Sequence, residues 1–368
     1  HRRRRLIVRG GFRISGVIRG AGYGGRMRIL VTGGAGFIGS NFVLRTLATR
    51  PDADVTVLDS FTYAANPDSL RETPASTAPA SPFVCEVVEG DVRNAELVDR
   101  LVAKHDAVVH FAAESHNDNS LRDADPFVSS NVVGTVTLLK ACAKHDVRLH
   151  HISTDEVFGD LALDDPARFT PRTPYNPSSP YSASKAAADH FVRAWVRSFG
   201  LAATISNCSN NYGPRQHPEK FIPRQICGLL RGREPRLYGT GDNVRDWIHV
   251  DDHNDAVWTI LDRGAIGETY LIGADGERAN IDVVGDVLES FGRGRGDFIH
   301  VTDRPGHDRR YAIDPSSMEA LGWEPAHRDF AAGLAETVDW YRDNPAWWAE
   351  AYDAAEAGYA RVEKRIAP

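Results

Sequence analysis

The sequence predicts an α/β protein in which a doubly wound parallel sheet is combined with a smaller α/β domain at the carboxy-terminal end. Three observations lead to this fold class. Strand-like apolar runs alternate with helix-like segments, as in sheets whose parallel strands are joined by crossover helices. A glycine-rich turn at residues 33–39 joins the first strand to the first helix. Polar residues follow several strands directly, which places them at the edge where open α/β sheets bind ligands.

The composition is typical of a soluble globular protein of one large or two modest domains, with 42% hydrophobic and 25% charged residues in a chain of 368. No apolar run approaches the roughly 20 residues of a membrane span, so we expect no membrane segment. The four cysteines are scattered and show no C-x-x-C spacing. They predict free thiols in a reducing compartment, which for this chain is the cytoplasm.

Residues 1–26 differ from the rest of the chain, because they contain eight arginines and no acidic residue. The remainder therefore carries a net charge of −15, against −7 for the whole chain. A stretch of this kind is also found in transit peptides and nucleic-acid-binding arms. Residues 27–30 look like a natural start, so we interpret residues 1–26 as a disordered extension without function. The acidic remainder argues against nucleic acid as a partner.

The first strand, glycine turn and helix form the context that a dinucleotide fingerprint requires. Residues 28–32 are the strand, and residues 41–47 have the apolar pattern of a helix. Gly33 allows the tight turn, Gly36 lets the backbone approach a pyrophosphate, and Gly39 lets the helix pack on the strand. This arrangement predicts a Rossmann-type domain. The cofactor contacts expected from the turn are Gly33, Gly36, Phe37, Ile38 and Gly39.

The second strand, residues 55–58, ends in Asp59, twenty residues after Gly39. A carboxylate at this position accepts hydrogen bonds from the ribose hydroxyls and repels a 2′-phosphate, which favours NAD over NADP. Later strand ends extend the same site. The residues expected there are Asp91, for the adenine amino group, with Val92, and then Ala112, Ala113 and Ser115, where small side chains allow close approach to the cofactor.

The chemistry is concentrated between Ser153 and Lys185. Tyr181 and Lys185 are four residues apart at the start of a predicted helix and therefore share one face. A nearby ammonium favours the phenolate, so this tyrosine is a candidate base. Residues 154–156, Thr-Asp-Glu, follow a strand and offer a hydroxyl, a general acid and a general base. A surface Tyr/Lys pair and a helix cap are the simpler interpretations of these two patterns.

The carboxy-terminal half carries polar side chains suited to an anionic ligand. Lys220 and Arg245 are candidates for a diphosphate, and Tyr238 for stacking on a base. His249 and His253 do not suggest a metal site, because one ends a strand and the other lies in a helix.

Several segments together resemble a known superfamily. Residues 32–39, Asp59, Asp91, residues 112–115 and the Tyr181/Lys185 pair resemble the extended short-chain dehydrogenase/reductases. The resemblance sharpens to the dTDP-glucose 4,6-dehydratases over about residues 27–348. It is carried by residues 112–116, 153–159, 207–214, 218–223, 243–247 and 303–311. The adjacent Asp155 and Glu156 are its most specific part, because the epimerases of the superfamily lack that pair.

The resemblance implies conversion of dTDP-glucose to dTDP-4-keto-6-deoxyglucose by internal hydride transfer through bound NAD. Tyr181, with its pKa lowered by Lys185, would take the 4-hydroxyl proton, and Thr154 would orient the 4-oxygen. Glu156 would remove the C5 proton and Asp155 would protonate the leaving 6-hydroxyl. Asn211 would join the cofactor site. The residues implied for substrate binding are His116, Thr154, Asn210, Lys220, Phe221, Tyr238, Arg245, Asn280, Arg304 and His307.

The resemblance also implies a homodimer formed through the helix that carries Tyr181 and the helix before it. We divide the chain into an NAD-binding domain, a nucleotide-sugar-binding domain and a helical tail. Their bounds are 27–205 with parts of 235–275, 206–348 and 349–368.

Three residues depart from the family pattern: Phe158 replaces a usual Tyr, Asn119 a usual Arg, and Phe221 a usual Leu. Three other functions stay open at this point. They are dehydration of a UDP- or GDP-hexose, C4 epimerisation, and a non-catalytic NAD-binding sensor.

Overall fold

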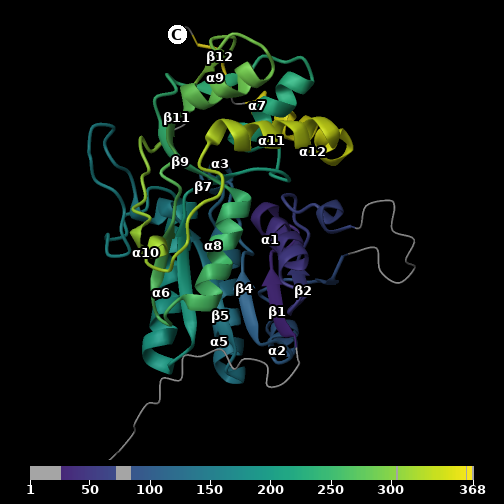
Figure 1. Cartoon of the computed structure of the whole chain (residues 1–368), viewed down its shortest axis with the longest axis vertical. Helices are drawn as coiled ribbons and strands as arrows, with labels where there is room; N and C mark the ends of the chain where they lie inside the picture. Colours follow the sequence, from purple (N-terminus) through teal and green to yellow (C-terminus); the bar gives the residue numbers. More distant parts are fainter. Residues whose placement is uncertain (1–25, 72–83, 304–305, 362, 367–368) are drawn as a thin grey trace, which may run out of the picture.

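The computed structural model describes residues 26–71, 84–303, 306–361 and 363–366. A large sheet with helices on both faces forms the lower part in Figure 1, and a smaller group of helices and short strands lies above it. The predicted fold class is confirmed. Most of the extension at residues 1–26, and the predicted site residue Arg304, lie outside the described residues.

The large sheet has seven strands in the order β10-β6-β5-β4-β1-β2-β3, and all neighbouring strands are parallel. Its strands are β1 (Met27–Thr32), β2 (Ala53–Asp59), β3 (Glu86–Glu89), β4 (Ala107–His110), β5 (Arg148–Thr154), β6 (Ala203–Cys208) and β10 (Thr269–Ile272). The order in which the chain adds strands to the sheet reverses between β1 and β4, although the strands themselves stay parallel. This switch point creates a crevice at the carboxyl ends of the strands.

Side chains from alternate positions of the central strand enter the two cores on opposite faces of the sheet. Ile29 and Val31 pack with Phe42 and Trp258, which come from the helices on one face. Leu30 packs against the other face. The first layer contains α1 (Phe37–Thr49) and α8 (Val250–Arg263), and the second contains α2 (Ala95–Val102), α5 (Thr135–His145) and α6 (Pro180–Phe199).

The helical segment over residues 128–145 is not one regular α-helix. It begins as the π-helix η2 (Val128–Gly134) and continues as α5. The remaining short helices of this part are η1 (Pro67–Leu70), α3 (Asn117–Ser120), α4 (Asp125–Phe127), η3 (Asp155–Phe158) and α10 (Ser316–Glu319).

The smaller part is built on two short sheets, ordered β11-β9-β7 and β12-β8, and on four helices. Its strands are β7 (Asn210–Tyr212), β8 (Arg236–Tyr238), β9 (Val244–His249), β11 (Glu277–Ala279) and β12 (Ile299–Val301), and its helices are α7 (Phe221–Leu230), α9 (Asn280–Ser290), α11 (Phe330–Asp343) and α12 (Pro345–Tyr359). An aromatic core that includes Tyr212, Trp247, Tyr341, Trp348 and Tyr352 holds these elements together.

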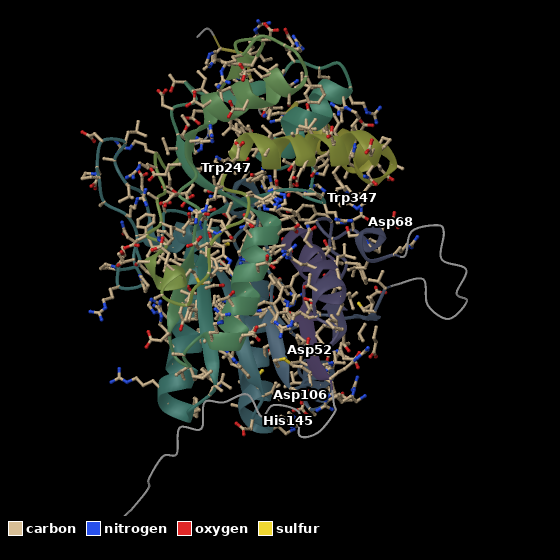
Figure 2. All side chains as sticks on the ribbon, viewed as in Figure 1. Asp52, Asp68, Asp106, His145, Trp247 and Trp347 are labelled. Atoms are coloured by element: carbon tan, nitrogen blue, oxygen red, sulfur yellow. The ribbon has the colours of Figure 1, made fainter. Side chains whose placement is uncertain are left out.

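Helix α12 crosses the predicted boundary at residue 348, because Trp348 and Tyr352 pack in one core. Trp347, at the junction of the two parts in Figure 2, donates its indole N–H to Ser69 of η1 at 3.1 Å. Beyond α12, Arg365 pairs with Val301 as an antiparallel bridge. Across the described ranges, no helix combines the length and the apolar character that crossing a membrane would require.

Candidate active site

Two cavities lie at the carboxyl ends of the sheet strands. The larger has a volume of about 650 Å³ and the smaller about 170 Å³. Glu156, Glu219 and Lys220 line both, so the cavities meet at these side chains. Two elongated ligands can therefore bind, one in each cavity, with their reacting ends at the junction.

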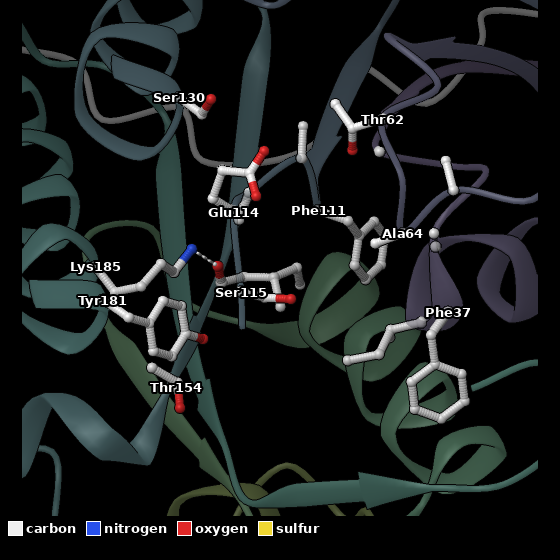
Figure 3. Close-up of a pocket in the computed structure, with 18 of the residues that line it drawn as sticks. Phe37, Thr62, Ala64, Phe111, Glu114, Ser115, Ser130, Thr154, Tyr181 and Lys185 are labelled. Carbon is white, nitrogen blue, oxygen red and sulfur yellow. Dashed lines mark hydrogen bonds between the residues drawn. The ribbon is translucent and has the colours of Figure 1, made fainter. Parts of the chain in front are cut away.

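All the residues predicted to hold the cofactor line the larger cavity. They are Gly33, Gly36, Phe37, Ile38, Gly39, Asp59, Asp91, Val92, Ala112, Ala113, Ser115, Tyr181, Lys185 and Asn211. In Figure 3, Tyr181, Lys185 and Thr154 lie on one side of this cavity and Phe37 on the other.

The glycine turn has the geometry that a dinucleotide needs. Gly33 has φ +72°, and a Cβ there would lie 2.5 Å from the backbone nitrogen of Ala112. A Cβ on Gly39 would lie 2.2 Å from the carbonyl oxygen of Gly33. The N-cap Gly36 provides no capping side chain, and the first turn of α1 lines the cavity. The amide groups of this turn are thus available to a pyrophosphate.

Asp59 is held rigidly at the end of β2. Its carboxylate accepts hydrogen bonds from the backbone N–H groups of Ala35 (2.8 Å) and Phe61 (2.9 Å). Burial raises the pKa of Asp59, and the two N–H groups oppose this increase. Each oxygen retains a lone pair that a ribose hydroxyl can use.

Asp91 lies at the cavity, but a neighbouring guanidinium already occupies its carboxylate. Arg93 donates to Asp91 from Nε at 2.9 Å to each oxygen, and from Nη2 at 2.5 Å. This pairing lowers the pKa of Asp91. The sequence analysis did not predict this interaction. An adenine amino group would have to share the carboxylate of Asp91 with Arg93.

Tyr181 and Lys185 extend from the first two turns of α6 towards the end of β5. The Nζ of Lys185 donates to the carbonyl oxygen of Ile152 at 2.7 Å, the contact dashed in Figure 3. Burial, followed by the charge of Glu156, raises the pKa of Tyr181 well above its usual value, and Thr154 opposes this increase. The shift of the Tyr181 pKa therefore runs opposite to the predicted lowering by Lys185, and burial is its largest cause.

Residues 154–156 run from the last residue of β5 into the first turn of η3. Thr154 is the N-cap of η3 and its hydroxyl accepts from the N–H of Glu156 at 3.3 Å. Glu156 lies at the junction of the cavities, where Asn117 donates to it at 3.2 Å. Asp155 is 2% exposed, and it is absent from the described residues that line either cavity.

The two adjacent carboxyl groups lie in different environments. Burial, then the charges of Glu156 and Asp246, raises the pKa of Asp155 well above its usual value. Asp246 is itself a buried carboxyl, and burial raises its pKa to about 7. This shift favours the protonated form of Asp155, the form that a general acid needs. Its Oδ1 accepts from the Thr154 hydroxyl at 3.3 Å.

The predicted substrate residues gather around the smaller cavity, apart from Thr154, which lines the larger one, and Arg304. Those lining the smaller cavity are His116, Asn210, Lys220, Phe221, Tyr238, Arg245, Asn280 and His307. Several of them already bond to protein groups, including Lys220, which donates to the carbonyl oxygen of Ser115 at 3.1 Å. Arg245 donates to the carbonyl oxygens of Val244 (2.7 Å) and Asp308 (2.8 Å), and the hydroxyl of Tyr238 donates to Glu363 at 2.8 Å.

Comparison with known proteins agrees with this arrangement. The family model described as GDP-mannose 4,6 dehydratase matches residues 30–337. The dTDP-glucose 4,6-dehydratase of Mycolicibacterium smegmatis is 62% identical over 334 residues, which cover 90% of this chain and 98% of the relative. The chain belongs to the dTDP-glucose 4,6-dehydratase family.

Two more distant members of the dTDP-glucose 4,6-dehydratase family agree over almost their whole lengths. The enzyme named dTDP-glucose 4,6-dehydratase 1 of Escherichia coli K12 is 45% identical, with 87% of this chain and 94% of the relative covered. The solved structure of DesIV from Streptomyces venezuelae, with NAD and TYD bound, has a TM-score of 0.82 and 46% identity. It covers 88% of this chain and all of DesIV.

The structure adds site residues that the sequence analysis missed. Glu219 lines both cavities, and burial raises its pKa while Lys220 opposes the increase. Asn131, in the π-helix, exchanges two hydrogen bonds with the backbone of Glu114 and donates to Ser184 at 2.8 Å. Glu219 precedes the predicted site residue Lys220 in the sequence, so this neighbouring position could have indicated it. Asn131 depends on a helix irregularity that periodicity does not reveal.

One group of possible metal ligands occurs in the described part of the chain. Ligand atoms of His249, His327 and Glu336 lie within 4.8 Å of one another. The two imidazoles are stacked with ring centroids 4.0 Å apart, so their in-plane lone pairs do not converge. Nδ1 of His249 also accepts from the N–H of Asp251, which leaves the proton on Nε2. This arrangement is unfavourable for binding a metal.

Proposed function

We propose that the chain converts dTDP-glucose to dTDP-4-keto-6-deoxyglucose, the reaction of a hydro-lyase that uses NAD. One observation carries the proposal. The Tyr181/Lys185 pair and the Asp155/Glu156 pair meet beside the junction of a dinucleotide-shaped cavity and a second cavity. The family supports this substrate, because its members here carry the name dTDP-glucose 4,6-dehydratase.

The cofactor is NAD, which is present in the solved structures of the DesIV and Bacillus anthracis relatives. Gly33, Gly36 and Gly39 would hold its pyrophosphate and Asp59 its adenosine ribose. When bound, NAD would supply the redox chemistry for oxidation at C4 of the sugar and reduction at C6. Its oxidised ring is positively charged, and this charge would favour the phenolate of Tyr181 in the site where burial disfavours it.

The side chains divide the proton transfers among them. Thr154 orients the 4-oxygen and Tyr181 takes the 4-hydroxyl proton. The resulting ketone acidifies C5–H, and Glu156 at the cavity junction removes that proton. Asp155 supplies a proton to the 6-hydroxyl, which leaves as water. Glu156 returns a proton to C5 when C6 is reduced. Because Asp155 lies behind the cavity wall, its side chain must turn towards the sugar for direct transfer.

The alternatives are not favoured. A C4 epimerase needs Tyr181 and Lys185 but has no use for an acid–base pair at residues 155 and 156. A non-catalytic NAD sensor would not need to keep either pair. Dehydration of a UDP- or GDP-hexose uses the same chemistry, so the substrate is decided by experiment.

The test is mass spectrometry of the purified protein with dTDP-glucose in D2O without added cofactor. We expect loss of one water and incorporation of one solvent deuteron at C5. Unchanged dTDP-glucose, with turnover of a UDP- or GDP-hexose, would overturn the substrate assignment. No turnover across these nucleotide sugars, with NAD added, would overturn the enzyme assignment.

The role of Asp59 leads to a prediction for the Asp59→Asn variant. Loss of the charged acceptor should weaken NAD binding roughly 10–100-fold, because a hydrogen bond to a charged group contributes about 1.5–3 kcal/mol. Isothermal titration with NAD and NADP measures this, and discrimination against NADP should decrease. Asp54→Ala, an exposed position on the same strand, is the control. Unchanged NAD affinity in Asp59→Asn would refute the assignment.

We also propose a homodimer formed through α6 and the segment before it. Phe191, Trp195 and Phe199 form an aromatic row on α6, with Phe191 39% and Phe199 66% exposed. Val128 and Val133 of η2 are about half exposed, and η2 packs beside α6. A second copy of the chain would remove this apolar surface from water.

The double variant Phe191→Arg/Phe199→Arg should shift the protein from dimer to monomer at micromolar concentration, because each copy would bring two charges into the apolar contact. Sedimentation velocity measures the change. Leu163→Arg, at an exposed loop position (48%), should leave the dimer intact. A wild-type monomer at these concentrations, or a double variant that stays dimeric, would refute this interface.

We retain the predicted division of labour as a proposal. Residues 27–205, with parts of 235–275, bind NAD, and residues 206–348 bind the nucleotide sugar. We further propose a cytoplasmic location. It is supported by the free thiols of Cys85, Cys142, Cys208 and Cys227.

A further inference from the structure

A buried carboxylate lies one helical turn beyond Lys185. Asp189 follows Lys185 at the i+4 position of α6, so Tyr181, Lys185 and Asp189 occupy one face of the helix. Asp189 is 0% exposed and Lys185 is 5% exposed. Asp189 lines neither cavity, and the proposed reaction assigns it no proton transfer.

The surroundings of Asp189 are built to hold an ionised carboxylate. Its Oδ2 accepts hydrogen bonds from the hydroxyls of Tyr175 (2.7 Å) and Ser153 (2.9 Å) and from the amide of Asn207 (3.1 Å). Its Oδ1 lies 3.2 Å from Nε2 of His151. Three donors on one oxygen favour the charged form.

The other titratable groups around this position are neutral near pH 7. Burial lowers the pKa of His151 on β5, and it lowers the pKa of His110 on β4 well below the usual range. Burial raises the pKa of Cys208 on β6 to about 12. Tyr181 and Tyr175 are buried phenols whose pKa values are raised. Among the described residues that contact this group, the only other cation is Arg193. It donates a hydrogen bond to the hydroxyl of Tyr175 at 2.7 Å.

The two charges also act on each other in the direction expected of an ion pair. Burial lowers the pKa of Lys185, and Asp189 opposes this decrease. Burial alone would raise the pKa of Asp189, but His151, Lys185 and Tyr175 outweigh it, so that the pKa is lowered. The hydrogen bond that Lys185 itself donates goes to a neutral acceptor, the carbonyl of Ile152. Asp189 is thus the group that offsets the buried ammonium.

We propose that Asp189 is the buried counter-ion of Lys185 and a positioning residue for C4 oxidation. It keeps the ammonium charged beneath Tyr181, and it ties α6 to β5 and β6 through Ser153 and Asn207. The proposal rests on the proposed function, in which Tyr181 accepts the 4-hydroxyl proton beside a charged Lys185.

The test is the pH dependence of single-turnover C4 oxidation of dTDP-glucose by the NAD-loaded protein. This step precedes proton transfer by Asp155, so titration of Asp155 does not limit it. Without the carboxylate, Lys185 should lose its proton at lower pH. Asp189→Asn should move the basic limb of the profile down by at least about one pH unit, since a neighbouring opposite charge shifts a pKa by about 1–3 units.

Tyr175→Phe is the matched control, because it removes one buried hydrogen bond from Asp189 and keeps the charge. Its basic limb should coincide with that of the wild type, even if its rate is lower. A purely structural role would lower the rate or stability of Asp189→Asn without moving the limb, and that result would overturn the proposal. Absence of C4 oxidation in the wild type would instead overturn the proposed function.

A second measurement does not depend on activity. Unfolding by denaturant is compared for Lys185→Met, Asp189→Asn and the double variant. Each single variant leaves one buried charge without its partner, whereas the double variant removes both. The double variant should therefore lose less stability than the sum of the two single losses. Additive losses would show that the two charges do not compensate each other and would overturn the proposal.

Discussion

The Tyr181→Phe variant should lose almost all turnover of dTDP-glucose while keeping its fold. Proton transfer by a positioned side chain contributes roughly 10²–10⁴-fold to a rate, and this variant removes the only phenol placed between Thr154 and Lys185 at the end of β5 among the described residues. The phenyl ring retains its contact with Phe127, whose ring centroid lies 6.2 Å away. The kcat of the purified variant, measured by mass spectrometry of the product, should therefore fall by at least about 100-fold.

A matched variant separates chemistry from packing. Tyr270→Phe also removes the hydroxyl of a buried tyrosine. Tyr270 lies on the edge strand β10, and its hydroxyl accepts from the N–H of Ala265. It should keep near wild-type turnover. NAD content and thermal unfolding should be similar in Tyr181→Phe and the wild type. Turnover of Tyr181→Phe within a few-fold of the wild type would show that another group takes the 4-hydroxyl proton.

Local patterns were sufficient to predict the sheet and the cofactor end of the site. The glycine spacing and the position of Asp59 follow from short-range geometry, because a strand, a turn and a helix N-terminus lie within about 30 residues of one another. Every predicted cofactor residue consequently lines one cavity. The strand order also follows from rules on chain connection rather than from individual contacts.

Competition between side chains could not be predicted from sequence patterns, whether the competing residue is near in the sequence or far away. The guanidinium of Arg93 donates to the carboxylate of Asp91. The carboxylate of Glu363, far along the chain, accepts from the hydroxyl of Tyr238. Burial is a property of the whole fold, so sequence patterns could not show that the pKa of Tyr181 is raised. The depth of Asp155 is a related case: adjacency to Glu156 indicated an acid–base pair, but only the packed structure places one carboxyl at the cavity and the other behind its wall.

The two adjacent carboxyls should stop the reaction at different steps when they are changed separately. Glu156→Gln removes the base, so the 4-ketone should form without exchange of the C5 hydrogen in D2O. Asp155→Asn keeps this base and removes the acid, so the 4-ketone should form and C5 should exchange, but water should not leave. Each overall rate should fall by roughly 10²–10⁴-fold.

Asp155→Asn is the sharper of the two variants, because burial favours the neutral form of Asp155 and an amide introduces no new charge there. Its unfolding free energy should therefore stay close to that of the wild type. Asp164→Asn, an exposed carboxyl in the loop that follows, should retain full turnover and serves as the control. Loss of C5 exchange in Asp155→Asn, together with retained exchange in Glu156→Gln, would reverse the two assignments. Retained dehydration in Asp155→Asn would mean that the proton on the leaving hydroxyl comes from elsewhere, and the second buried carboxyl of Glu219 at the cavity junction would then be the group to change next.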